Sequence, residues 1–229
     1  MGQYVLPGNP PVEVTLRRSA RARRISLRVS GVDGRVTLTM PPGVAERTAL
    51  NFANEKAAWL RTQLSRQPDM TEVRIGSDLP VEGRLRHLAP GAGRRIQLTD
   101  DTLTVPGPPE TAPRRVQAWL KTRARDQLAA ASDHHAQAVG RGYARLTLRD
   151  TRSRWGSCTH DAGLMYSWRL ILAPREVLDY VAAHEVAHLV EMNHSRAFWD
   201  IVARICPGYD APRRWLRENG AELHRYRFD

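Results

Sequence analysis

Cysteine, lysine and long apolar runs are scarce in this sequence of 229 residues. The two cysteines, Cys158 and Cys206, are too few for the disulfide framework of a small secreted domain. No apolar run approaches the roughly 18 residues of a membrane-spanning helix, and the first residues, MGQYVLPGNP, lack the charged-then-apolar build of a signal peptide. We therefore expect a soluble, cytoplasmic protein with no membrane partner.

Lys56 and Lys121 are the only lysines, so arginine carries almost all of the net charge of +11. A basic surface suits polyanions such as nucleic acid or nucleotide phosphates, and six arginines fall between Arg17 and Arg28. A GC-rich genome also favours arginine over lysine, and charged side chains can protect the edge of a sheet. Nucleic acid is thus a partner that the composition allows without requiring it.

The first 66 residues alternate between strand and helix patterns. Residues 12–16, 25–29 and 35–39 alternate apolar and polar side chains, which predicts half-buried strands, and Val32-Asp33-Gly34 is a hairpin turn signal between the last two. An apolar stripe at helical spacing then predicts one helix over about 44–66.

Residues 72–105 hold short strand-like pieces that glycine and proline interrupt. The segment Pro106-Gly-Pro-Pro109 is the clearest break in the chain, and we interpret it as a stiff linker. This predicts two domains, a β-rich N-terminal domain with one helix over 1–108 and a metal-binding catalytic domain over 109–229.

Strand patterns dominate the N-terminal part and helix patterns the C-terminal part, so the fold class is predicted to be α+β. We expect a helix at 112–139, a strand at 144–150, a turn at 151–158, a strand at 163–173, a helix beginning at Pro174, a helix that Ser195 caps and that runs to about 205, and a last helix at about 210–223.

The helix after Pro174 contains His184-Glu185-Val-Ala-His188. Residues four apart lie on one face of a helix, so His184 and His188 can direct imidazole nitrogens at one metal ion. Glu185 lies at the rim of that face, where a carboxylate reaches a metal-bound water. The surrounding residues are apolar, and charged groups in a core need partners, which favours a metal site over a solvated helix face.

Two histidines do not complete a catalytic zinc site, and His194 is the best candidate for the third ligand. In a continued helix, His194 would lie roughly 9 Å along the axis from His188, which is too far for one ion. The helix must therefore end near 191–193 and the chain must turn back. Asn193 suits that turn because asparagine tolerates the left-handed conformation. If His194 is not a ligand, His160 or Glu222 are the next candidates.

These ligands predict one zinc ion, although manganese, cobalt or nickel also accept histidine. The fourth position would hold a water whose pKa falls to about 7, and Glu185 would take its proton and pass it to the leaving group. Tyr166 and Arg169 are weak candidates for stabilising the oxyanion, because strand residues near a cleft more often pack.

Three segments, TRSRWGSC, SWRLILAP and DYVAAHEVAHLVEMNHSRAFW, together resemble the YgjP-like metallopeptidase family, which is related to SprT-like and Wss-type zinc proteases. The resemblance implies a zincin-like fold, zinc ligands at His184, His188 and His194, and catalysis by Glu185. In TRSRWGSC, Arg152, Arg154 and Trp155 either line a positively charged cleft or have structural roles, with Trp155 packing and Gly156 making a turn.

Four functions remain open from the sequence. The first is a zinc metallopeptidase that binds an extended peptide as an added strand. The second is a metal-dependent nucleoside triphosphate hydrolase, in which Arg152, Arg154 and Arg169 would suit phosphates. The third is a nucleic-acid-associated SprT-like protease. The fourth is a structural zinc site that Cys158 or His160 closes.

Overall fold

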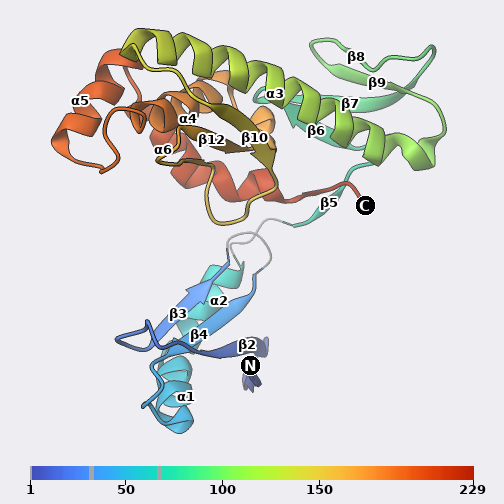
Figure 1. Cartoon of the computed structure of the whole chain (residues 1–229). Helices are drawn as coiled ribbons and strands as arrows, with labels where there is room; N and C mark the ends of the chain where they lie inside the picture. The colour runs from blue at the N-terminus through green and yellow to red at the C-terminus, as the bar shows by residue number, and fades with distance from the viewer. Residues whose placement is uncertain (1, 31–33, 66–68) are drawn as a thin grey trace. The chain divides into compact units, whose positions relative to one another are not determined.

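The computed structural model describes residues 2–30, 34–65 and 69–229, and the chain divides into two compact units, Met1–Asp69 and Met70–Asp229. The division therefore falls about forty residues before the expected boundary at 108/109. Figure 1 shows each unit with its own sheets and helices. Among the helices that the described residues form, none combines the length and apolar composition needed to cross a membrane.

The first unit is a four-stranded sheet covered by two helices. Its strands, β1 (Gly2–Leu6), β2 (Val12–Arg18), β3 (Ser26–Val29) and β4 (Val36–Met40), lie in the order β1-β2-β4-β3. β2 and β4 are parallel, and the other pairs are antiparallel. Three of these strands confirm the expected alternation, whereas β1 was not predicted. Most of the expected Val32-Asp33-Gly34 turn lies outside the described residues.

The helix expected over 44–66 is two helices, α1 (Glu46–Glu55) and α2 (Ala57–Ser65), which meet at Lys56. Their apolar side chains close the core of this unit, which is formed by Leu6, Val12, Val14, Leu16, Val36, Leu38, Met40, Ala49, Ala53 and Leu60. Splitting the helix lets both pieces direct their apolar residues at one small sheet. A stripe at helical spacing does not reveal that break.

The second unit begins with strands that belong to the same core as the later helices. β6 (Asp78–Val81), β7 (Arg84–Gly91), β8 (Gln97–Leu98) and β9 (Thr102–Pro106) form a sheet in the order β6-β7-β9-β8. The segment expected to be a linker instead forms a single 3-10 turn, η1 (Pro109–Thr111), that leads directly into α3 (Ala112–Val139). Because Leu103 and Val105 of β9 share a core with Val116 of α3, no boundary can fall between them.

The long helix α3 runs through the core of this unit, and it contacts β9, α4 and α5 along its length (Figure 1). It ends at Gly140, which caps the helix in the left-handed conformation, with a φ of 66°. Glycine adopts this conformation at low cost. The helix expected over 112–139 is therefore confirmed.

A three-stranded sheet follows, in the order β10-β12-β11, from β10 (Arg145–Arg149), β11 (Gly156–Cys158) and β12 (Gly163–Ser167). β10 is parallel to β12, and β11 is antiparallel to it at one edge. The strand expected over 163–173 ends at Ser167 and continues as a 3-10 helix, η2 (Trp168–Leu172). Because Trp168 and Leu170–Leu172 are all buried, their sequence shows no periodicity that could separate strand from helix.

The remaining elements build the helical side of the unit. They are α4 (Arg175–Ala187), α5 (Arg196–Ile205), α6 (Asp210–Asn219) and η3 (Gly220–His224). The final strand β13 (Tyr226–Arg227) pairs in parallel with β5 (Thr71–Glu72), so the two ends of the second unit meet in one small sheet. The fold is α+β, as predicted.

Candidate metal centre

Helix α4 carries the first two histidines and is fixed on several sides. It contacts α3, α5, α6, η2 and the edge strand β11. Its buried residues include Val177, Val181 and Val186, so the apolar flanks that the sequence shows do form a core helix. The imidazoles of His184 and His188 therefore project from a rigid element.

The helix ends at Ala187, earlier than the expected 191–193. His188 is the C-cap, and the amides of Leu189, Val190 and Glu191 continue to donate to carbonyls of the last turn. Asn193 does not have the positive φ that we expected of it. The chain reverses because the helix unwinds through this hydrogen-bonded turn, and the amide of Asn193 donates to Oε1 of Glu191.

This reversal brings His194 back to the two helix histidines. One ligand atom from each of His184, His188 and His194 lies within 4.8 Å of the others. Nε2 of His184 lies 3.0 Å from Nε2 of His194, close to the roughly 3.4 Å between two nitrogens that each lie about 2.1 Å from a tetrahedral zinc ion. Among the described residues, these three form the group whose ligand atoms converge in this way.

The ring of His188 is oriented by the backbone. Its Nδ1 donates to the carbonyl of Glu191 at 3.0 Å, which leaves Nε2 free for a metal. The contact comes from the backbone carbonyl of Glu191 and not from its side chain. This hydrogen bond fixes both the tautomer of His188 and the direction of the lone pair on its Nε2.

Phe198 packs beneath all three imidazoles and is fully buried. Its ring centroid lies 4.9 Å from that of His184, 4.5 Å from that of His188 and 4.8 Å from that of His194. The hydroxyl of Ser195 accepts from the amide of Phe198, which confirms Ser195 as the N-cap of α5. The cap thus places the apolar floor of the site, a role that the sequence analysis did not assign.

The electrostatics of the site favour neutral imidazoles. Burial lowers the pKa of His184 to about 3, and the neighbouring His188 and His194 add to this shift. Burial and His194 also lower the pKa of His188. A metal binds only the unprotonated ring, so these low pKa values keep His184 and His188 available as ligands in mildly acidic solution.

Glu185 is buried between α4 and the edge strand β11. Burial raises its pKa to about 8, and the nearby Arg154 opposes part of that rise. The room for its carboxyl group exists because residue 156 is a glycine: a Cβ there would lie 2.5 Å from Oε1 and 2.6 Å from Cγ of Glu185. Gly156 lies in β11 and does not make the turn that the sequence suggested.

Two residues proposed as substrate contacts have other partners. The hydroxyl of Tyr166 is buried and hydrogen-bonded to Ser132 at 3.0 Å. The guanidinium of Arg169 makes two hydrogen bonds to Asp150, at 2.6 and 3.1 Å, and two more to the carbonyls of Leu223 and Tyr226. Arg169 therefore fastens the C-terminal segment to the end of β10.

The residues of the RWGSC segment and the preceding Arg152 differ in their roles. Trp155 packs on His224, with 5.0 Å between ring centroids, and a Cβ at Gly220 would lie 3.2 Å from its ring, so Trp155 is a packing residue. Arg152 and Arg154 are exposed on the loop that precedes β11. Of these two, Arg154 is the one whose charge acts on Glu185.

The residues offered as alternative ligands lie elsewhere. Cys158 donates to the carbonyl of Thr159, His160 is exposed, and Glu222 pairs with Arg225 at 3.1 Å. None of them belongs to the converging group that the described residues form. A structural site closed by four protein ligands has no support in this arrangement.

Comparison with known proteins identifies the family of the chain. Residues 23–219 match the family model of the YgjP-like metallopeptidase domain. Among solved structures, the crystal structure of the metallopeptidase zymogen of Pyrococcus abyssi abylysin is similar over 40% of this chain and 93% of that chain, with 18% identity and a TM-score of 0.36, a likeness too distant to assign any residue. No curated protein matches the sequence.

Proposed function

The chain belongs to the YgjP-like metallopeptidase family, and we propose that it cleaves peptide bonds with one zinc ion held by His184, His188 and His194 and with Glu185 as the base. The observation that carries the proposal is the convergence of three imidazole nitrogens. The buried Glu185 follows His184 on the same helix. A bound zinc would polarise the scissile carbonyl and acidify water, while other divalent transition metals suit the same ligands less well.

Glu185 moves the proton. Its carboxylate accepts a proton from the attacking water and delivers it to the departing amine, a role that requires a pKa near neutrality. Burial raises the pKa of Glu185 to about 8 and Arg154 opposes that rise, so this carboxylate binds a proton more readily than a solvent-exposed glutamate does. The narrow space opposite Gly156 restricts the carboxyl group to a small range of positions, so the base is in place before the substrate binds.

The substrate lies along β11. This strand pairs with β12 on one side only, so its other edge has backbone groups available for an extended peptide. β11 also contacts α4, which places that edge beside the helix that carries Glu185. Addition of a strand to a sheet edge gives affinity through main-chain hydrogen bonds.

The test is the Glu185→Gln variant, assayed against a fluorogenic peptide library with zinc measured on the same samples. We expect about one zinc per chain in both proteins and a loss of turnover of at least about a thousand-fold in the variant. Glu191→Gln is the matched control, because its carbonyl and not its side chain holds His188. Normal turnover by Glu185→Gln would contradict the assignment of the base.

Nucleotide hydrolysis is the weaker alternative, because Arg169, one of the three arginines that it needs, is engaged by Asp150 and two carbonyls. Recruitment to nucleic acid has more support. Arg17, Arg21, Arg23, Arg24 and Arg28 are all exposed in the first unit. Binding to DNA that weakens steeply as salt rises, and that is lost when these arginines become glutamine, would establish it.

A further inference from the structure

The face of the β10-β12-β11 sheet that points away from α4 bears a cavity of about 480 Å³, within the range of small-molecule pockets. Strand register places Thr147, Met165 and Ser157 in one row across its floor. Gly156, one residue before Ser157, points to the opposite face and Glu185. The cavity and the metal centre therefore lie on the two sides of one edge strand.

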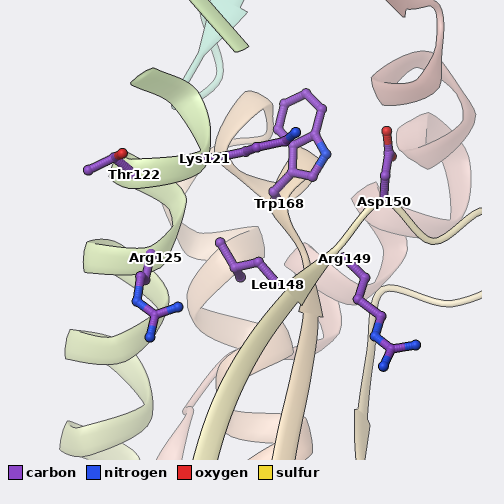
Figure 2. Close-up of a pocket in the computed structure, with 7 residues that line it drawn as sticks. All are labelled: Lys121, Thr122, Arg125, Leu148, Arg149, Asp150 and Trp168. Carbon is purple, nitrogen blue, oxygen red and sulfur yellow. The ribbon is translucent and has the colours of Figure 1, made fainter. Parts of the chain in front are cut away.

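Three arginines line this cavity, and they differ in how their charge is balanced. Arg145 is paired with Asp161 at 2.8 Å. Arg149 and Arg154 have no acidic partner within 4 Å among the described residues. The carboxylate next to Arg149, Asp150, is held by Arg169. Figure 2, a view of a neighbouring pocket that Arg149 also lines, shows the Arg149 side chain extending away from Asp150. The cavity thus carries the positive charges of Arg149 and Arg154 at one end, and the charge of Arg154 also acts on Glu185.

Two hydroxyl groups are available as donors, Ser153 at the same end and Ser157 in the middle row of the floor. Ser153 and Ser157 line the cavity, and among the described residues neither hydroxyl has a hydrogen-bond partner. The loop that carries Ser153 is fixed, because the hydroxyl of Thr151 donates to the carbonyl of Arg154 at 2.8 Å and the amide of Ser167 donates to the carbonyl of Trp155 at 2.8 Å. The end of the cavity is therefore arranged before any ligand arrives.

We propose that Arg149, Arg154, Ser153 and Ser157 bind the phosphate group of a small phosphate monoester. A phosphate monoester carries a charge of about −1.5 to −2 at pH 7, which two guanidinium groups without an ion-pair partner can balance, and its oxygens accept from both guanidinium and hydroxyl donors. The site lies on the opposite face of β11 from Glu185, and its binding of phosphate does not depend on the proposed peptidase activity, although Arg154 also acts on Glu185.

A single phosphate fits this face better than a nucleic-acid backbone does. Arg145 and Arg149 are four residues apart on β10, so the neutral end of the cavity lies about 13 Å from the charged end. There Asp161, whose side chain is 62% exposed, would face a second phosphate and repel it. A polyanion requires positive charge along its length, whereas this cavity provides it at one end.

The experiment measures binding of inorganic phosphate to the full-length, zinc-loaded chain by isothermal titration calorimetry, and repeats it with a nucleoside monophosphate. We expect saturable binding of both, weakened at least about ten-fold in Arg149→Gln, because one charge-assisted contact is lost. Arg145→Gln is the matched control on the same face; since Asp161 already neutralises that arginine, its effect should stay below about two-fold.

Three results would overturn the proposal. Equal affinity of the wild type and Arg149→Gln would mean that phosphate binds elsewhere, including on the zinc ion. Equal losses of phosphate affinity in Arg149→Gln and Arg145→Gln would mean that only the overall positive charge of this face attracts phosphate. Binding of a single-stranded oligonucleotide far more tightly than of phosphate, abolished by Arg149→Gln, would make the cavity part of a nucleic-acid surface. Peptidase activity enters none of these readouts, so failure here and failure of the peptidase assignment are separable.

Discussion

Gly156 and Glu185 are in such close contact that a Cβ at position 156 would lie 2.5 Å from the carboxyl oxygen Oε1. The same Cβ would lie 2.6 Å from Cγ, so rotation of the carboxyl group alone cannot relieve the clash. Because Glu185 is buried, it has little space into which to retreat. The edge strand therefore fixes the position of the base.

Gly156→Ala should lower kcat at least about ten-fold while zinc content stays at that of the wild type, because a displacement of about 1 Å is costly in a positioned base. The shorter side chain of Glu185→Asp leaves room for a Cβ at position 156. Adding Gly156→Ala to Glu185→Asp should therefore lower kcat by a smaller factor than adding it to the wild type. Gly142→Ala is the control, since a Cβ at that position meets nothing within 4 Å. Measuring kcat and zinc content on the same samples tests the prediction. Loss of zinc in Gly156→Ala would contradict the view that Gly156 positions only Glu185.

The metal ligands could be predicted from the sequence because their geometry is local. A spacing of four on one helix puts His184 and His188 on one face, and bond lengths alone require the chain to turn before His194. The direction of the turn followed from the same argument. Its details did not, because the hydrogen bond from His188 to the carbonyl of Glu191 depends on where the helix unwinds.

What the sequence could not reveal depends on contacts between distant segments. Gly156 has a role only because β11 packs against α4, and a glycine in a sequence gives no sign of the side chain that fills its space. The same holds for Arg169, whose partners include carbonyls more than fifty residues away. The proline-rich segment 106–109 looked like a linker because composition does not show that the flanking β9 and α3 share a core.

Phe198→Leu should weaken zinc binding by about ten-fold and lower the free energy of unfolding by about 1–3 kcal/mol. The phenyl ring contacts all three imidazoles, so a smaller side chain lets each ligand rotate. Phe228→Leu is the matched control, because Phe228 is also buried but packs on Trp168. Competition with a chelator measures the affinity; equal losses in the two variants would show that general packing, and not contact with the ligands, is responsible.

Arg169→Ala should lower the free energy of unfolding by about 2 kcal/mol or more and leave kcat/KM within about two-fold of the wild type. Four hydrogen bonds are lost, and the carbonyls of Leu223 and Tyr226 lose a charged donor. Urea unfolding and peptide cleavage are measured on the same samples. A raised KM without loss of stability would instead assign Arg169 to substrate binding.

Arg145→Ala supplies the comparison for that experiment. Its ion pair with Asp161 is exposed, with 55% and 62% of the two side chains accessible, so its loss should cost less than about 1 kcal/mol. The contrast between the two arginines would show that burial and multiple partners, and not the presence of an ion pair, make Arg169 important for stability.

His224 should make the protein less stable in mild acid. Burial against Trp155 lowers its pKa to about 4, the cations Arg169 and Arg152 lower it further and Asp150 opposes them, whereas in the unfolded chain its pKa is about 6.5. As the pH falls below 6.5, the unfolded state takes up a proton that the folded state refuses, so stability is complete above pH 6.5 and declines towards pH 4. The two pKa values correspond to a loss of about 2 kcal/mol between pH 7 and pH 5.

His224→Phe removes the titrating ring and keeps an aromatic partner for Trp155, so its free energy of unfolding should fall about 2 kcal/mol less than that of the wild type over the same interval. Urea titrations of zinc-loaded protein at pH 7 and pH 5 measure the difference. Loss of zinc in acid affects both proteins alike and cancels in the comparison. Identical pH dependence in the two proteins would mean that His224 accepts a proton as readily folded as unfolded, and that the acid sensitivity lies in the metal ligands.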